Sequence, residues 1–335
     1  MDPVNSDFQA PRGWRDPHLQ TLRSRILPTV FDLSDVGTSA EVIVDLDDGT
    51  GDRIRYWHHT PFRNNPAVNH ISCVVLIHGL GGSANSEYML SSAHAFLQVG
   101  IPVARVDLRG AGDSYDLSRH YYHAGRTEDV RAVLRSVLLR AGYGVVPMGF
   151  SLGGNMTVKV LGEPDELPGV LAGISVSTPL DLVEGSAYIQ AVAFGLYERF
   201  IVFNLRHELQ KGFAELTEQQ WREVRRARRL EAFDNAYTAP ENGWRDAIEY
   251  YSVNSSSQFL PRVQRPLLMV HSADDPMVPV APYERLQWDD LARRNRISRA
   301  ITGIGGHLGF HERGRKYRWF SRVALQYLLS LRDDS

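Results

Sequence analysis

The segment at residues 145–154 reads VVPMGFSLGG and places a serine between glycines. Ser151 follows an apolar, β-branched run and precedes residues 155–161, which can continue as a helix. A serine in a tight strand-to-helix turn needs small neighbours, because a Cβ at Gly149 or Gly153 would collide with the crossing backbone. This is the pattern of a nucleophile elbow, so Ser151 is the candidate nucleophile. The G-x-S-x-G pattern also arises by chance, and the assignment therefore needs support from other residues.

Two further residues are needed, because a serine hydroxyl reacts only with a base in hydrogen-bonding reach and a group that orients this base. An apolar run ends in two acids followed by prolines, where Asp275 is the candidate acid and Asp274 the alternative. His307 is the candidate base, and we expect its glycine-rich loop to be mobile enough to swing the imidazole over Ser151. The nearby His311 is expected to be exposed. The order serine, aspartate, histidine is that of the α/β-hydrolase triad.

Acyl transfer also needs donors for the developing oxyanion, usually two backbone N–H groups. Leu152, at the start of the predicted helix, supplies the first. The second is expected from the glycine-rich loop after residues 73–77, where Leu80 is the candidate and Gly81 the alternative. His78 in the same loop has the chemistry of a base, but we expect it to brace the loop by hydrogen bonds.

The elements that must position these residues alternate along the chain. Residues 41–46 and 53–57 alternate in polarity around a turn, which predicts an antiparallel hairpin. Apolar runs then recur with helical stretches between most of them, which predicts a mainly parallel sheet with helices on both faces. The predicted strands are 73–77, 103–106, 145–148, 174–176 and 267–270, and the main predicted helices are 86–98, 127–140 and 152–162.

The interval from residue 178 to residue 265 has no convincing strand pattern. Helical patterns at 183–203, 207–233 and 244–251 predict a cap above the sheet, and a closing helix is predicted at 317–331. We expect one domain over residues 1–335, with the core at 40–177 and 263–335, a helical cap insertion at about 178–262 and an irregular N-terminal segment at 1–39. Apolar cap residues are expected to form a pocket for short or medium acyl chains, among them Ile189, Val192, Phe194, Leu196, Phe200 and Phe203.

Composition and motif spacing argue against several classes of function. The 37 Lys and Arg against 39 Asp and Glu give a net charge of −2, which offers no electrostatic case for nucleic acid binding. The start of the chain lacks the features of a signal peptide, and no apolar run is long enough for a transmembrane segment, so a cytoplasmic protein is expected. The loop at 107–114 lacks phosphate-binding patterns, and the aromatic cluster at 120–123 lacks zinc spacing and is expected to line the pocket or pack. No metal and no cofactor are therefore expected.

Taken together, these motifs resemble the YheT-like family of α/β-hydrolases over nearly the whole chain. The family implies a triad that falls here on Ser151, Asp275 and His307, and a carboxylic-ester hydrolase activity. The chain departs from the family pattern at Gly81, where an acid is often found, and in the loop at 108–113. The motifs that carry the resemblance are Asp16-Pro17-His18-Leu19-Gln20-Thr21, residues 78–83 with 85–86, residues 122–125 and residues 149–155.

We expect a serine carboxylesterase that hydrolyses short- to medium-chain esters through an acyl-enzyme on Ser151, with a small-molecule ester as its substrate. Resolution of the same acyl-enzyme by an alcohol would make the protein an acyltransferase, and a lipase or phospholipase is a further alternative. A protein that keeps the fold and binds without turnover is the least favoured alternative.

Overall fold

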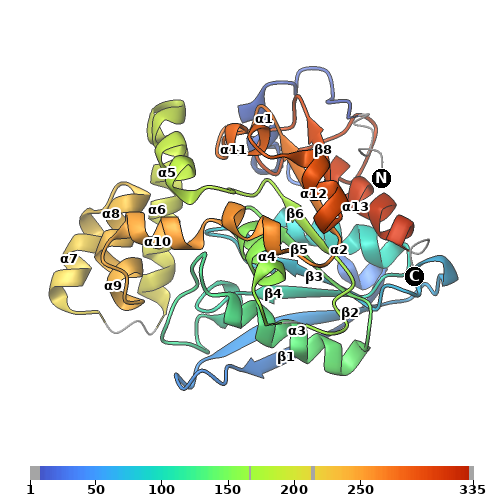
Figure 1. Cartoon of the computed structure of the whole chain (residues 1–335), viewed down its shortest axis with the longest axis horizontal. Coiled ribbons are helices and arrows are strands. Elements are labelled where there is room, and N and C mark those ends of the chain that lie inside the picture. Colours follow the sequence, from blue (N-terminus) through green and yellow to red (C-terminus); the bar gives the residue numbers. More distant parts are fainter. Residues whose placement is uncertain (1–7, 166, 213–215, 332–335) are drawn as a thin grey trace.

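The computed structural model describes residues 8–165, 167–212 and 216–331. Within these residues, eight strands form one sheet in the order β1-β2-β4-β3-β5-β6-β7-β8 (Figure 1). β1 and β2 form an antiparallel hairpin, β2 is antiparallel to β4, and the other neighbours are parallel. The α/β-hydrolase architecture predicted from the sequence is confirmed. The strands are β1 (Gly37–Asp45), β2 (Arg53–Pro61), β3 (Cys73–Ile77), β4 (Val103–Asp107), β5 (Val145–Phe150), β6 (Gly173–Val176), β7 (Leu267–Ser272) and β8 (Ile297–Thr302).

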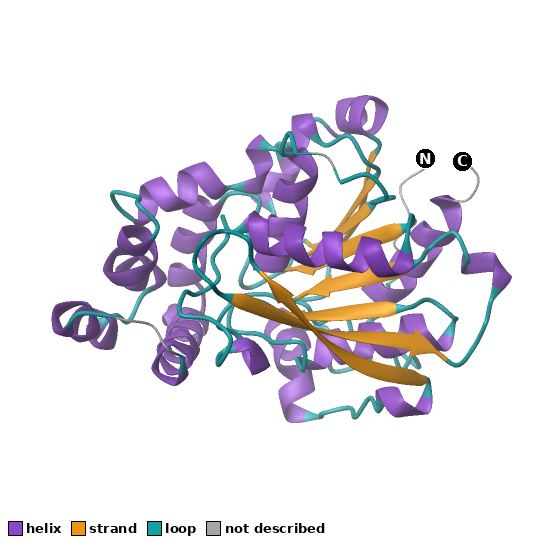
Figure 2. Cartoon of the chain, turned by 90° about the horizontal axis from the view of Figure 1, so that it is seen from below, coloured by secondary structure: helices purple, strands orange, loops and turns teal. Residues whose placement is uncertain are grey.

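Helices cover both faces of the sheet (Figure 2). They are α1 (Pro17–Ile26), α2 (Glu87–Gln98), α3 (Thr127–Ala141), α4 (Leu152–Gly162), α5 (Leu182–Ala191), α6 (Leu196–Lys211), α7 (Glu218–Arg226), α8 (Leu230–Phe233), α9 (Ala239–Glu241), α10 (Ala247–Asn254), α11 (Ala281–Glu284), α12 (Trp288–Asn295) and α13 (Trp319–Ser330). On β3, Cys73, Val75 and Ile77 belong to one core cluster with residues of α3, α4 and α12. Val74 and Leu76 belong to a second cluster with residues of α2 and α13. Successive side chains of a strand point to opposite faces, so the two helix groups lie on opposite sides of the sheet.

The predicted strands correspond to β1 through β7, but β8 was not among them. Ile297, Ala300 and Thr302 of this strand have little exposure, whereas the residues between them are half-buried or exposed. β8 lies at the edge of the sheet and pairs with β7 alone, so it needs fewer apolar residues than the central strands. A polar edge strand therefore lacks the continuous apolar run by which the others were recognised.

The segment between β6 and β7 is helical, as predicted, but the predicted helix bounds are wrong. The helix expected at 183–203 is two helices, because Ala193 and Phe194 adopt positive φ angles of 48° and 53° between α5 and α6. The helix expected at 207–233 is also interrupted, and α7 begins afresh with a capping box at Thr217. In Figure 1 these helices form the yellow-green to orange group beside the sheet.

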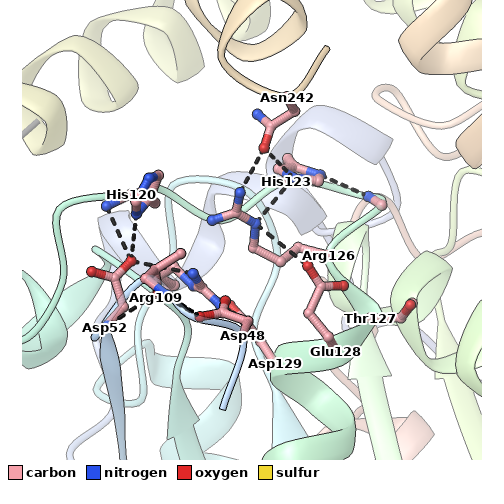
Figure 3. A network of polar contacts seen from close by, with 12 residues as sticks. Asp48, Asp52, Arg109, His120, His123, Arg126, Thr127, Glu128, Asp129 and Asn242 are labelled. Carbon is pink, nitrogen blue, oxygen red and sulfur yellow. Dashed lines mark hydrogen bonds and ion pairs between the residues drawn. The ribbon is translucent and has the colours of Figure 1, made fainter. Parts of the chain in front are cut away.

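A buried ion cluster around Arg109 fixes the hairpin to the loop after β4 and to α3 (Figure 3). The fully buried guanidinium donates to Asp48 at 2.7 Å, to Asp52 at 3.2 Å and to Asp129 at 3.0 Å. Asp52 also contacts His120 Nδ1 at 2.8 Å. The loop at 107–114 is therefore a structural loop, because its arginine binds two other segments, the turn of the hairpin and α3.

We expect Arg109→Met to lower the free energy of unfolding by about 3–5 kcal/mol, because the substitution leaves buried carboxylates without their cation. Urea denaturation measures the change. Arg135→Ala is the matched control, since Arg135 forms an exposed ion pair with Asp165 whose loss should cost about 1 kcal/mol or less. Equal losses in the two variants would contradict a structural role for the buried cluster.

Candidate active site

Ser151 lies between β5 and α4 in a strained turn, with φ 52° and ψ −118°. Its backbone N–H donates to Val176 O at 2.8 Å, which ties the turn to β6. A Cβ at Gly149 would strike the carbonyl of Gly153, and a Cβ at Gly153 would strike the carbonyl of Ile77. These close approaches are the steric requirement inferred from the sequence. They explain why glycine stands on both sides of the serine.

The imidazole of His307 contacts the carboxylate of Asp275, with Nδ1 at 2.9 Å from Oδ2 and 3.1 Å from Oδ1. Both side chains are buried. Burial alone would raise the pKa of Asp275, but the charge and hydrogen bond of His307 hold it below its ordinary value. The N–H groups of Met277 and Val278 also donate to Oδ1 at 2.8 and 3.0 Å. An ionised carboxylate so placed fixes the orientation of the imidazole and stabilises its protonated form.

Asp274, the alternative acid, has a different set of contacts. Its Oδ1 accepts from the N–H of Gly306 at 2.9 Å and from the hydroxyl of Ser272. It therefore supports the backbone of the loop that carries His307, and the carboxylate that contacts the imidazole is that of Asp275. This geometry favours Asp275 over Asp274 as the acid.

Several backbone N–H groups near Ser151 are candidate donors to the oxyanion. Leu152 is the first residue of α4, where the N–H groups have no carbonyl partner within the helix. Leu80 and Leu152 both line the cavity that contains Ser151. The alternative donor, Gly81, already donates to the hydroxyl of Tyr122 at 2.6 Å. The geometry thus favours Leu80 over Gly81.

His78 is buried, and backbone groups lie against both of its ring nitrogens. Nδ1 lies 2.8 Å from Gly79 O, and Nε2 accepts from the N–H of Leu108 at 3.1 Å. Burial lowers its pKa to about 4, so the ring is neutral near pH 7. These contacts are those of a histidine that braces two loops.

Helix α1 holds the loop that carries His307, a role that the sequence did not reveal. The hydroxyl of Thr21 accepts from the N–H of His307 at 2.9 Å. Gln20 is fully buried, and its amide accepts from the N–H of His311 at 2.9 Å and donates to His311 O at 3.3 Å. A Cβ at Gly306 would lie 2.5 Å from Pro17 O. The loop glycines therefore allow α1 to approach closely, and the expectation that they serve to make the loop mobile has no support in these contacts.

The expectation that His311 is exposed is wrong. Its ring is half-buried against α1, with Nδ1 3.0 Å from the guanidinium of Arg23 and Nε2 3.3 Å from the hydroxyl of Ser24. Burial and the nearby arginines lower its pKa to about 2. Of the N-terminal motif at 16–21, Gln20 binds the backbone of His311, and the sequence does not show that this motif and His311 meet in space.

Ser151 and His307 line a mainly apolar cavity with an open volume of about 830 Å³. Its walls come from the sheet edge and from the cap, including Ile189 of α5 and Ile201 and Leu205 of α6. Of the six cap residues expected in the acyl pocket, Ile189 lies in the cavity wall. Four others are exposed on the outside of the cap instead, namely Phe194, Leu196, Phe200 and Phe203. Because the helix breaks before α6, the side of α6 that faces the sheet differs from the side that one continuous helix would present. A helical period read across the whole segment could not show this difference.

The part of the cavity formed by the cap contains a buried carboxylate, Asp234, in a π-helical turn. Asp234 accepts from the hydroxyls of Thr238 and Tyr251, each at 2.6 Å. Burial raises its pKa from 3.8 to about 6, and the two hydrogen bonds oppose this shift only in part. The charged form of Asp234 is thus unfavourable in the folded protein.

We expect Asp234→Asn to raise the free energy of unfolding at pH 8 by about 2–3 kcal/mol, because it removes a buried charge whose pKa is higher in the folded than in the unfolded chain. The cost of this charge is fully present above the folded pKa of about 6 and disappears as the pH falls below the ordinary value of 3.8. Urea denaturation at pH 8 and at pH 4 measures the difference, with the exposed Asp47→Asn as control. A gain of the same size at both pH values would contradict the pKa assignment.

Across residues 8–165, 167–212 and 216–331, no group of three or more His, Cys, Asp or Glu side chains is arranged to hold a metal ion. In the same part of the chain, none of the helices combines the length and the apolar character needed to cross a membrane.

Comparisons with known proteins give the family. The alpha/beta hydrolase family model matches residues 74–317. The chain is 28% identical over 312 residues to the protein YheT of Escherichia coli, which is named as an esterase, and the match covers 91% of this chain and 87% of YheT. It is 26% identical over 298 residues to a monoacylglycerol lipase of Saccharomyces cerevisiae, with 84% of this chain and 64% of the lipase covered.

A solved structure of an esterase from Pyrococcus furiosus, Pf2001, aligns with a TM-score of 0.57 at 15% identity, over 90% of this chain and 92% of that chain. This likeness shows the fold alone. The family match, in contrast, spans more than half of the chain and includes Ser151, Asp275 and His307. The protein therefore belongs to the alpha/beta hydrolase family, and its resemblance to the YheT-like members is confirmed.

Proposed function

We propose that the protein is a serine carboxylesterase that cleaves short- to medium-chain esters through an acyl-enzyme on Ser151. The observation that carries the proposal is the Asp275–His307 pair in the same apolar cavity as a serine held in a strained elbow. An apolar cavity with a few polar groups at one end fits a substrate with an acyl chain and one reactive carbonyl.

In this mechanism His307 accepts the proton of Ser151 as the serine oxygen attacks the ester carbonyl. Asp275 keeps the imidazole oriented and stabilises its protonated form. The N–H groups of Leu152 and Leu80 donate to the developing oxyanion. The alcohol leaves with the proton from His307, and water, activated by the same imidazole, then releases the acid and restores the serine.

A lipase is the alternative that a specific observation favours. The cavity is lined mainly by apolar side chains, which suits a longer acyl chain, and one relative is named a monoacylglycerol lipase. Transfer of the acyl group to an alcohol in place of water would use the same groups. Product analysis with added ethanol separates transfer from hydrolysis, and monoacylglycerols of increasing chain length test the lipase.

We expect the purified protein to hydrolyse p-nitrophenyl esters with a maximum at short or medium acyl chains, and Ser151→Ala to lower the rate by about 10⁴-fold or more. A series from acetate to palmitate gives the chain-length preference. Ser186→Ala is the matched control, because Ser186 lies in the wall of the same cavity and donates to Val183 O, so its loss should leave most of the activity. Equal activity in the parent and in Ser151→Ala would remove Ser151 from the reaction.

Thr21→Val should lower kcat by about tenfold with little change in KM, because the amide of His307 loses its hydrogen-bond acceptor while the cavity walls stay as they are. Steady-state kinetics on the best ester of the series measure both constants. Thr38→Val, an exposed change on β1, is the control, and melting temperatures show whether each variant is folded. A rise in KM at constant kcat would contradict a role for Thr21 in positioning the base.

A further inference from the structure

Large apolar side chains are exposed on two neighbouring helices, in a set that we call the apolar face. On α6 they recur at positions i, i+4 and i+7, and on α1 at i, i+3 and i+7, so each set forms a stripe along one side of its helix. Phe194, just before α6, is 93% exposed. The apolar face consists of Leu19, Leu22, Ile26, Leu27 and Val30 with Phe194, Leu196, Phe200 and Phe203.

The two stripes belong to one surface because α1 and α6 are in contact. His18 Nδ1 lies 2.9 Å from the hydroxyl of Tyr197, and the two rings stack with centroids 5.7 Å apart. The guanidinium of Arg25 lies 4.1 Å from the centre of the Phe200 ring. Contiguous exposed apolar patches of this kind mark interaction sites, whereas single exposed apolar residues need no explanation.

The inner side of α6 already packs within the protein. Ile201 and Leu205 line the cavity that contains Ser151, so the helix is apolar toward the active site as well as toward solvent. The outer apolar stripe of α6 is separate from this inner side and is exposed to solvent.

The backbone before α6 directs an aromatic side chain outward. Ala193 and Phe194 both adopt left-handed φ angles, which residues other than glycine rarely do. The result is a phenylalanine that is almost fully exposed at the edge of the apolar face. Strained backbone of this kind is typical of functional segments.

Exposed cationic side chains lie on both helices of the apolar face, and the exposed acids Asp32 and Asp35 follow Val30 at its end. Arg25 at the end of α1 and Arg199 and Lys211 on α6 are exposed. The acids of α6 are withdrawn from solvent, because Glu198 is buried and burial raises the pKa of Glu208 to about 8. The exposed acid of α1, Asp16, caps the start of that helix.

An apolar surface with cationic side chains at its margin is complementary to an anionic lipid bilayer, where aromatic side chains enter the interface and basic groups meet the headgroups. A second copy of the chain is the other occupant that such a face could take, and the test below separates the two. We propose that the apolar face is a docking surface for anionic lipid membranes. Through the inner side of α6, it lies next to the cavity that takes the acyl chain.

The test is co-sedimentation of the full chain with vesicles of phosphatidylcholine that contain phosphatidylserine. The double variant Phe194→Ser with Phe203→Ser should lower the bound fraction about tenfold or more, because two phenylalanines no longer leave water. Leu139→Ser with Tyr143→Ser is the matched control, since both residues are exposed at the end of α3 that leads into β5, away from α1 in Figure 1. This control should bind as the parent does. Vesicles of phosphatidylcholine alone, or added salt, should also weaken binding.

Three outcomes would overturn the proposal. One is a parent protein that does not sediment with either type of vesicle, and another is equal binding by the double variant and the parent. The third is a parent that light scattering shows to be a dimer and a double variant that is a monomer, which would assign the apolar face to a second copy. Melting temperatures show whether all variants are folded. Because binding is measured without turnover, its failure is separate from failure of the proposed esterase activity.

Discussion

The structure depends on one close crossing, where β5 turns into α4 at Ser151. The backbone of this turn passes so near to the end of β3 and to the first turn of α4 that only glycine fits at Gly149 and Gly153. The crossing sets the serine at the edge of the sheet with a left-handed φ, and it directs the first N–H groups of α4 toward the same side. The candidate nucleophile and a candidate oxyanion donor therefore come from the same local geometry.

The other half of the site is held from outside the sheet. Two distant segments hold the backbone of the loop around His307, namely Asp274 after β7 and Thr21 on α1. Asp275 contacts the imidazole of His307. Helix α1 thus contacts the candidate base and, through His18, the cap. It is a structural part of the candidate active site.

Much of the fold could be predicted because the central strands are buried on both faces and so appear as continuous apolar runs. β8 was not predicted, because a strand at the edge of a sheet needs fewer apolar residues. The cap was recognised as helical but was wrongly divided, because local propensity does not predict the left-handed turn at Ala193 and Phe194. As a result, Phe200 and Phe203 were expected in the acyl pocket and are found on the surface.

The sequence by itself determined the fold class, the candidate nucleophile Ser151, the candidate base His307 and a choice between two acids, Asp274 and Asp275. It could do so because the elbow needs glycines at fixed spacing and the acid and base follow strands in a recognisable order. Only the tertiary structure decided which carboxylate meets the imidazole of His307 and that α1 supports its loop. It also decided which side of α6 faces the cavity. These are contacts between segments distant in the chain, and their geometry is set by how the helices pack on the sheet, which no local pattern of residues encodes.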